Sequence, residues 1–324
     1  MPSVSRINFF PIRPLSTDSI MISIRPFLQL FRLPAVFTAL ADIFLGYLLV
    51  HNSLLSGREQ SPVDFLLLLG TSASLYLSGM VWNDVFDRHV DAKERPNRPI
   101  PSGRVSVRAA VMFALTLMFV GLACAAFVGR NTLLVAGLLT LCILLYDGGL
   151  KRTPVGPLAM GGCRFLNVIL GASSDWLRFE QVWWRPQLWV AAGLGVYIVG
   201  VTWFARTEAR QSSRVHLGLA MCVVNFGLAI LIGWLTRAPN PAVTPALFVL
   251  GVIGLSINRR LLVAISNPSP ERVQAAIKTM LLSVIMLDAT IIFAKLGQPG
   301  AGYAIATAAL IVPAMMLGRW LRLT

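Results

Sequence analysis

The chain contains few charged residues, and the acidic ones are the scarcest. Of its 324 residues, 14 are Asp or Glu and 28 are Lys or Arg, and together they make up 13%. Soluble globular domains contain roughly 25% charged residues, whereas 56% of this chain is hydrophobic. The composition therefore indicates a polytopic membrane protein. The net charge of +14 requires no nucleic-acid partner, because membrane orientation itself places Lys and Arg in loops.

Cysteines are also few, and their positions argue against disulfide and zinc chemistry. All four lie inside apolar stretches, and no CxxC or Cys/His spacing occurs; they are Cys124, Cys142, Cys163 and Cys222. A cysteine in such a setting packs as a small apolar residue. We therefore expect neither a disulfide nor a zinc site.

Residues 1–25 lack the apolar core and small-residue cleavage site of a secretory leader. They contain three arginines and one acid, Asp18. One interpretation is that Met21 is the true start and that the first twenty residues are a mis-assigned extension. The other is an organellar transit segment; we favour the first. No Gly/Ser linker separates a second domain, so we expect an N-terminal extension, disordered or mis-assigned, at 1–25 and one membrane domain at 26–324.

Ten apolar segments of about 20 residues follow one another without strand-like alternation. Backbone polar groups in lipid must be paired internally, and runs of this length and pattern favour helices over a barrel. The sequence predicts an all-α bundle with nine core transmembrane helices and a tenth at the C-terminus, to which we assign no role. The predicted segments are 27–50, 64–83, 107–129, 131–148, 157–174, 187–205, 215–236, 243–262, 273–295 and 301–318.

The distribution of Lys and Arg supports this layout. With the N-terminus inside, the inner segments hold 21 of these residues and the outer segments hold 6, while Arg164 lies within a span. This bias follows the positive-inside rule. It places the loops at 83–103, 148–156 and 206–214 on one side. We expect a multi-pass protein of a bacterial inner membrane, with both termini cytoplasmic.

The segment at residues 83–103 reads NDVFDRHVDAKERPNRPIPSG and concentrates acidic residues in an acid-poor chain. If it continues the preceding helix, the steps from Asp84 to Asp87 and from Asp87 to Asp91 are i,i+3 and i,i+4, and the three carboxylates lie along one face. Clustered carboxylates repel one another unless a cation or a proton relieves them. Mg²⁺ uses one or two carboxylates and completes its octahedron with water and phosphate oxygens. The pattern therefore predicts a site for Mg²⁺ and a phosphorylated lipid.

This motif, NDxxDxxxD followed by NRPxPSG between the second and third spans, resembles that of the UbiA superfamily of intramembrane prenyltransferases. The resemblance implies a helical bundle whose cavity opens to the cytoplasm and to lipid. It implies transfer of a prenyl group from an isoprenoid diphosphate to an acceptor. Asn83, Asp84, Asp87 and Asp91 would then bind Mg²⁺ and diphosphate. The sequences at 32–49, 146–167, 200–213 and 273–289 most resemble a divergent branch of Ebo type.

Other basic and polar residues are expected to bind the substrate. The sequence YDGGLKRTP resembles the family's tyrosine-then-lysine element, which implies that Tyr146, Lys151 and Arg152 hold the diphosphate. A preorganised cationic site stabilises charge on a leaving group, so Arg95 and Arg98 are further candidates. Intramembrane ionisable groups usually face a cavity or a partner. Arg164 and Asn167 therefore bind phosphate or form a structural pair with Asp147 or another acid. The resemblance implies that an acid in the first span orients the acceptor, which makes Asp42 a candidate, whereas Asp288 is the more ordinary buried acid. Trp203, Phe204 and Tyr197 face a prenyl cation or pack against other helices.

The chain departs from the family after the sixth span, where members carry a second aspartate-rich motif. Here the sequence reads YIVGVTWFARTEARQSS, and Glu208 is its only acid. Ala205 stands where we would expect an aspartate. Arg206 and Arg210 flank this place. Either one Mg²⁺ is bound and arginine replaces the second, since a guanidinium can bind phosphate oxygens bidentately, or the diphosphate chemistry is lost. We assign Glu208 to the metal and Arg206 to the substrate.

Two functions remain open. The first is a Mg²⁺-dependent prenyltransferase acting on an aromatic or lipid acceptor, which the intact first motif favours. The second is a non-catalytic or transport-type membrane protein that binds a prenyl lipid or a pathway intermediate, which the degraded second motif favours. A phosphatidyltransferase of the CDP-alcohol type would require a different spacing of acids within one helix. The sequence favours the enzyme.

Overall fold

The computed structural model describes residues 30, 35–54, 62–174, 179–183, 187–206, 213–237, 240 and 242–320, with the side chains of 319 and 320 excepted. Helices make up nearly all of these residues. They are α2 (Val36–Val50), α3 (Pro62–Glu94), α4 (Val107–Val128), α5 (Arg130–Gly148), η2 (Leu150–Arg152), α6 (Gly156–Gly171), η3 (Phe179–Trp183), α7 (Gln187–Ala205), α8 (Arg214–Leu235), α9 (Val243–Ser266), α10 (Pro270–Leu296), η4 (Gln298–Gly300), α11 (Ala301–Ala309) and α12 (Ile311–Trp320). The predicted extension at 1–25 lies outside the described residues.

The all-α prediction is confirmed, and the predicted segments correspond to helices in order. Within the described part of the chain, eight helical stretches are long and apolar enough to cross a membrane, and the shorter apolar helix α2 adds to them. The protein is therefore an integral, multi-pass membrane protein. The predicted tenth span is divided at Leu310 into α11 and α12. Pro313 explains the break, because it has no N–H to donate to the carbonyl of Ala309.

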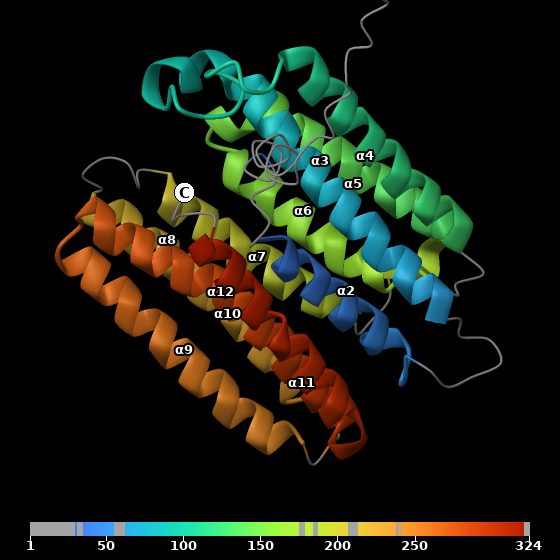
Figure 1. The fold of residues 1–324 in the computed structure, drawn as a ribbon. Coiled ribbons are helices and arrows are strands. Elements are labelled where there is room, and N and C mark those ends of the chain that lie inside the picture. The colour runs from blue at the N-terminus through green and yellow to red at the C-terminus, as the bar shows by residue number, and fades with distance from the viewer. Residues whose placement is uncertain are drawn as a thin grey trace, which may run out of the picture.

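The long helices lie roughly along one direction and surround α2 (Figure 1). Helices α3 to α6 pack together on one side of α2, and α7 to α10 pack together on the other. Helix α2 contacts members of both groups, α3 and α6 on one side and α7 and α10 on the other. The α11–α12 pair lies alongside α2 and completes this central layer (Figure 1).

Glycines allow the helices around α2 to approach closely. A Cβ atom added at Gly46 of α2 would lie 2.1 Å from the carbonyl oxygen of Val168 in α6, and one at Gly171 would lie 2.8 Å from the carbonyl of Ile43. The same holds between α6 and α7, where a Cβ at Gly161 would lie 2.6 Å from the carbonyl of Gly195. Lipid tails are as apolar as side chains, so moving a side chain from lipid to another helix gives no hydrophobic gain. Close packing at small residues is therefore a main source of stability between membrane helices.

Replacing Gly46 by alanine is expected to destabilise the protein by about 1–3 kcal/mol, the usual range for overpacking. The reason is that backbone atoms of α6, which cannot rotate away, occupy the space of the new methyl group. Thermal unfolding of the detergent-solubilised protein measures the change. Gly137→Ala is the matched control, since a Cβ there meets nothing within 4 Å and alanine favours the helix. Equal melting temperatures for the two variants would contradict the close contact between α2 and α6.

Candidate functional site

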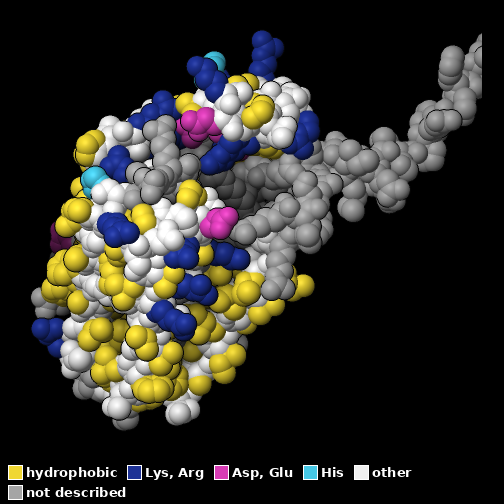
Figure 2. All heavy atoms as spheres, turned by 90° about the vertical axis from the view of Figure 1, so that its left-hand side faces the viewer, with side chains coloured by type: hydrophobic (Ala, Val, Ile, Leu, Met, Phe, Trp, Pro, Cys, Tyr) yellow, Lys and Arg dark blue, Asp and Glu magenta, His cyan; other side chains and the backbone are white. Residues whose placement is uncertain are grey.

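A cavity of about 950 Å³ lies at the centre of the bundle. Helices α2, α3, α5, α6, α7, α10 and α12 all contribute residues to its lining. Its size is at the upper end of the roughly 300–1,000 Å³ typical of ligand cavities. On the side of the molecule where the 95–106 loop lies, Lys, Arg and acidic side chains are grouped around a hollow, and hydrophobic side chains cover much of the rest (Figure 2). We call this side the aspartate side.

The acidic motif occupies the last turns of α3, which continues through it to Glu94. The predicted helix is therefore confirmed, but the three carboxylates do not act as one group. Arg98 Nη1 lies 3.2 Å from Oδ1 of Asp84 and 2.6 Å from Oδ2 of Asp91. Both carboxylates are 5% exposed. One guanidinium thus bridges two acids that stand seven residues apart, two helical turns.

Asp87 is bound instead by the segment that follows α5. Lys151 Nζ lies 2.8 Å from its Oδ2, and Arg152 Nη2 lies 3.1 Å from its Oδ1. Lys151 also lies 3.7 Å from Oδ1 of Asp147, an oxygen that accepts a hydrogen bond of 2.8 Å from Nδ2 of Asn83. The sequence predicted that these two segments share a site, and the structure brings them together at the rim of the cavity.

The loop after α3 places Arg98 by folding back on the helix. The Arg98 N–H bonds to the carbonyl of Arg95, and the Val105 N–H to that of Pro99. Ile100 and Val105 are buried in a cluster with residues of α3 and α4, so apolar contacts fix a loop that carries charge. Arg95 is exposed at the start of the loop, and the structure places it in no ion pair with the aspartates.

The loop between α5 and α6 is held from two sides. A Cβ at Gly156 would lie 2.9 Å from the carbonyl of Leu150 and 3.0 Å from Cα of Lys151, so only glycine lets α6 begin this close to η2. Arg206, at the end of α7, donates a hydrogen bond to the carbonyl of Thr153. Arg206 therefore supports the loop that carries Lys151, a role the sequence did not suggest.

Of the segment where the second motif was expected, the structure describes the part up to Arg206. Ala205 lines the cavity and presents a methyl group where a metal ligand was expected. Glu208, assigned to the metal from the sequence, lies outside the described residues. Among the described residues, the first acidic motif included, no three His, Cys, Asp or Glu side chains lie close enough together to hold a metal by themselves.

The acidic motif nevertheless suits a hard cation. Asp84 and Asp91 already hold one positively charged nitrogen between two of their oxygens. Mg²⁺ needs only one or two carboxylates when phosphate and water complete its coordination. The carboxylate oxygens of Asp84 and Asp91 fit that requirement, and they lie at the end of α3, whose Asn83 lines the cavity.

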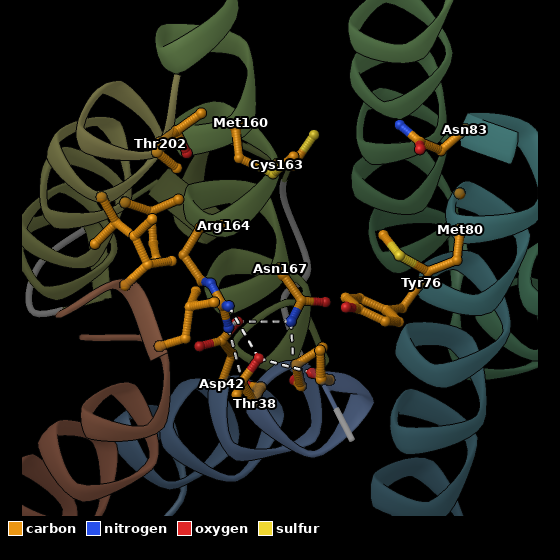
Figure 3. Close-up of a pocket in the computed structure, with 18 of the residues that line it drawn as sticks. Thr38, Asp42, Tyr76, Met80, Asn83, Met160, Cys163, Arg164, Asn167 and Thr202 are labelled. Carbon is orange, nitrogen blue, oxygen red and sulfur yellow. Dashed lines mark hydrogen bonds and ion pairs between the residues drawn. The ribbon is translucent and has the colours of Figure 1, made fainter. Parts of the chain in front are cut away.

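A second polar group lies deeper in the cavity, on α2 and α6 (Figure 3). Arg164 Nη1 lies 2.7 Å from Oδ2 of Asp42, and the same oxygen accepts a bond of 2.8 Å from Nδ2 of Asn167. Arg164 also donates to the carbonyl and the hydroxyl of Thr38. Asp42 is fully buried, and so is Asp288, neither of whose carboxylate oxygens has a hydrogen-bond partner among the described residues. We call Thr38, Asp42, Arg164 and Asn167 the deep polar cluster.

Several sequence interpretations change in the light of this geometry. The acid partner of Arg164 is Asp42. Asp147 lies instead with Asn83 and Lys151. Of the three aromatic candidates, Tyr197 and Phe204 are fully buried in the core and Trp203 packs against it. Tyr197 donates its hydroxyl to the carbonyl of Met280. The described cavity lining includes none of the three, so their role is packing.

The structure adds residues to the site that sequence reasoning missed. Tyr76 and Met80 of α3 line the cavity, seven and three residues before Asn83. That spacing places them on one helix face and could have revealed them. Lys278 of α10 also lines the cavity, whereas its charge had been counted only toward orientation. Tyr146, which the sequence assigned to the diphosphate, lines the cavity.

Residues 39–274 match the profile of the UbiA prenyltransferase family. The chain belongs to the UbiA prenyltransferase family. It is 34% identical over 163 residues to the digeranylgeranylglyceryl phosphate synthase of Metallosphaera sedula, a match over 49% of this chain and 55% of that protein. It is 38% identical over 131 residues to the synthase of the same name from Methanopyrus kandleri, over 40% of this chain and 46% of that protein. The matches thus span about half the length of these curated relatives. They do not support the resemblance to the Ebo-type branch.

Solved structures share the fold. The apo structure of a UbiA homolog from Aeropyrum pernix K1 superposes with a TM-score of 0.66 at 19% identity, covering 79% of this chain and 96% of that one. A UbiA homolog from Archaeoglobus fulgidus bound to GPP and Mg²⁺ gives 0.58 at 14% identity, covering 88% and 99%. At these sequence identities, the similarity shows that this chain shares the fold of the two solved structures and nothing more.

Proposed function

We propose that this protein transfers a prenyl group from an isoprenoid diphosphate to an acceptor inside the membrane, with the aid of Mg²⁺. The observation that carries the proposal is the pairing of Asp87 with Lys151 and Arg152 at the rim of the central cavity. It joins an acidic segment suited to a metal and a basic segment suited to phosphate at one place. A homolog of the same fold binds GPP and Mg²⁺, which supports the same ligands here.

The charges at the rim favour a diphosphate that enters together with a cation. Four carboxylates, those of Asp84, Asp87, Asp91 and Asp147, face three cationic groups there. The cationic side chains Arg98, Lys151 and Arg152 already have carboxylate partners, so a diphosphate alone would have to compete for them. Arg98, Lys151 and Arg152 would become available to the phosphates if their carboxylate partners held a divalent cation, because each carboxylate would then have another positive partner.

Bond breaking at the donor would be supported from the rim. The released Arg98, Lys151 and Arg152 would contact the phosphate oxygens and stabilise the charge that develops as the allylic C–O bond breaks. Mg²⁺ supplies further stabilisation of the leaving diphosphate. Asn83 would position Asp147 and the metal-binding carboxylates, and Tyr146 would contact the donor. Arg206 would act by supporting the loop of Lys151, without replacing a second metal.

The deep polar cluster would bind the polar part of the acceptor. Thr38, Asp42, Arg164 and Asn167 offer donors and acceptors deep in the cavity, and such groups usually fix the orientation of a ligand. The relatives named above act in the synthesis of a glyceryl phosphate lipid. A lipid acceptor of glycerophosphate type is therefore preferred over an aromatic one. The loops of the aspartate side would face the cytoplasm, and both termini would lie there with them.

The test uses the purified, full-length chain with radiolabelled geranyl and geranylgeranyl diphosphates. A single-chain glycerophosphate ether lipid and a phenolic acid serve as alternative acceptors, each with Mg²⁺ or with excess EDTA. We expect a labelled, two-chain lipid product and release of diphosphate, both dependent on Mg²⁺. Transfer to the phenolic acid alone would correct the acceptor class. Tight binding of the diphosphates without turnover on any acceptor would refute the enzyme and favour the carrier interpretation.

A further inference from the structure

The C-terminal helix α12 packs where α2 and α10 meet at the cavity. Ala314 of α12 is 3% exposed and is buried together with Ala41 of α2 and Ile285 of α10. Helix α12 packs against α2, and α11 packs along α10. In Figure 1 the α12 ribbon runs beside α2 and ends toward the aspartate side. The span that had no assigned role is thus part of the cavity.

The cavity has two walls of different character. On α2 and α6 the lining carries the deep polar cluster. On α10 and α12 the lining is polar only near the aspartate side, at Gln274 and Lys278, and is apolar below. The apolar part consists of Ile277, Leu281, Leu282, Ala314 and Met315. An isoprenoid chain has no hydrogen-bonding group, so its burial against this second wall leaves no polar group unpaired.

Two successive methionines of α12 face different surroundings. Met315 lines the cavity and is 40% exposed, whereas Met316 is 67% exposed and lies outside the described lining. Successive residues of a helix are about 100° apart around its axis. Val312, one turn before Met316, is also exposed, as expected for the face of α12 that is turned away from the bundle. Met315 and Met316 therefore form a matched pair for substitution.

We propose that α12 is the wall against which the prenyl chain of the donor lies, and that Met315 limits the length of chain that the cavity accepts. The inference rests on the proposed function for the nature of the donor. It adds a position for the chain: the diphosphate end lies at the aspartate side, and the hydrocarbon extends along α10 and α12 past Leu281 and Met315. Met315 is a specificity-determining residue in this scheme and takes no part in bond breaking.

The test measures binding, so that it does not depend on turnover. Unreactive thiolodiphosphate analogues of dimethylallyl, geranyl, farnesyl and geranylgeranyl chains are titrated into the full-length protein with Mg²⁺. For Met315→Trp we expect the dissociation constant of the geranylgeranyl analogue to rise by about tenfold relative to the dimethylallyl analogue, a modest overpacking effect. Met316→Trp should leave that ratio unchanged. Unaltered binding of the dimethylallyl analogue shows that the Met315 variant is folded.

The other outcomes separate this inference from the proposed function. If Met315→Trp changes binding of all four analogues equally, or if Met316→Trp changes the ratio as much, the chain does not lie along α12 and this inference fails alone. If the unaltered protein binds none of the four analogues, the donor assignment fails and the inference falls with it. Met315→Ala provides a second check. Removing side-chain volume should lower the dissociation constant of the geranylgeranyl analogue relative to that of the dimethylallyl analogue.

Discussion

Asp87→Asn is expected to lower the rate of prenyl transfer by about 100- to 1,000-fold, the usual effect of removing one group that stabilises developing charge. Asparagine keeps the size of the side chain but removes the negative charge that faces Lys151 and Arg152. Those side chains would then hold diphosphate without the Asp87 carboxylate beside them to hold the metal. Diphosphate release, followed at increasing Mg²⁺ concentration, should show both a lower maximum and a higher Mg²⁺ requirement.

Glu94→Gln is the matched control for this change. Glu94 lies on the same helix, seven residues after Asp87, and is exposed. The substitution removes the same charge from the same side of the molecule, so it reports the general effect of charge on the approach of a diphosphate. An equal loss of rate in both variants, or an unchanged Mg²⁺ requirement in Asp87→Asn, would show that Asp87 does not contact the metal.

The positions of the helices were largely predictable, because the thickness of the hydrocarbon layer sets the length of each apolar run. The continuation of α3 through Asp91 was also predictable, because its acids follow one another in steps of three and four residues. The separation of those acids into two groups was not. It depends on Arg98, which returns through a folded loop, and on Lys151, which lies 64 residues from Asp87. Any of several cations could have filled either place.

The arrangement of the helices around the cavity was less predictable than their positions. Hydropathy distinguishes a span from a loop, but a helix face turned to lipid and one turned to another helix are equally apolar. The contribution of α12 to the cavity follows from its contact with Ala41 and Ile285, which no local pattern encodes. The partner of Arg164 was uncertain for a related reason: Asp42 lies 122 residues away, and the sequence named Asp147 or another acid as the possible partner.

Arg164→Met is expected to destabilise the protein more than any other single substitution considered, by about 3–5 kcal/mol, because it leaves a buried charge without its partner. Asp42 is fully buried, and Oδ2 would lose its bond of 2.7 Å to the guanidinium. Asp288 would lose the same nearby positive charge. Thermal or denaturant-induced unfolding in detergent measures the loss, with Arg152→Met as control, since that guanidinium is 60% exposed and pairs at the rim.

The double variant Asp42→Asn, Arg164→Met separates the structural and functional roles of the pair. Removing both charges eliminates the uncompensated carboxylate at position 42, so much of the lost stability should return. The donor site at the rim is untouched, and the double variant should therefore still bind a geranylgeranyl thiolodiphosphate with Mg²⁺. Transfer to a glycerophosphate lipid should remain low, because two of the groups expected to orient the acceptor are absent. Full recovery of transfer in the double variant would mean that Asp42 and Arg164 serve only to join α2 to α6.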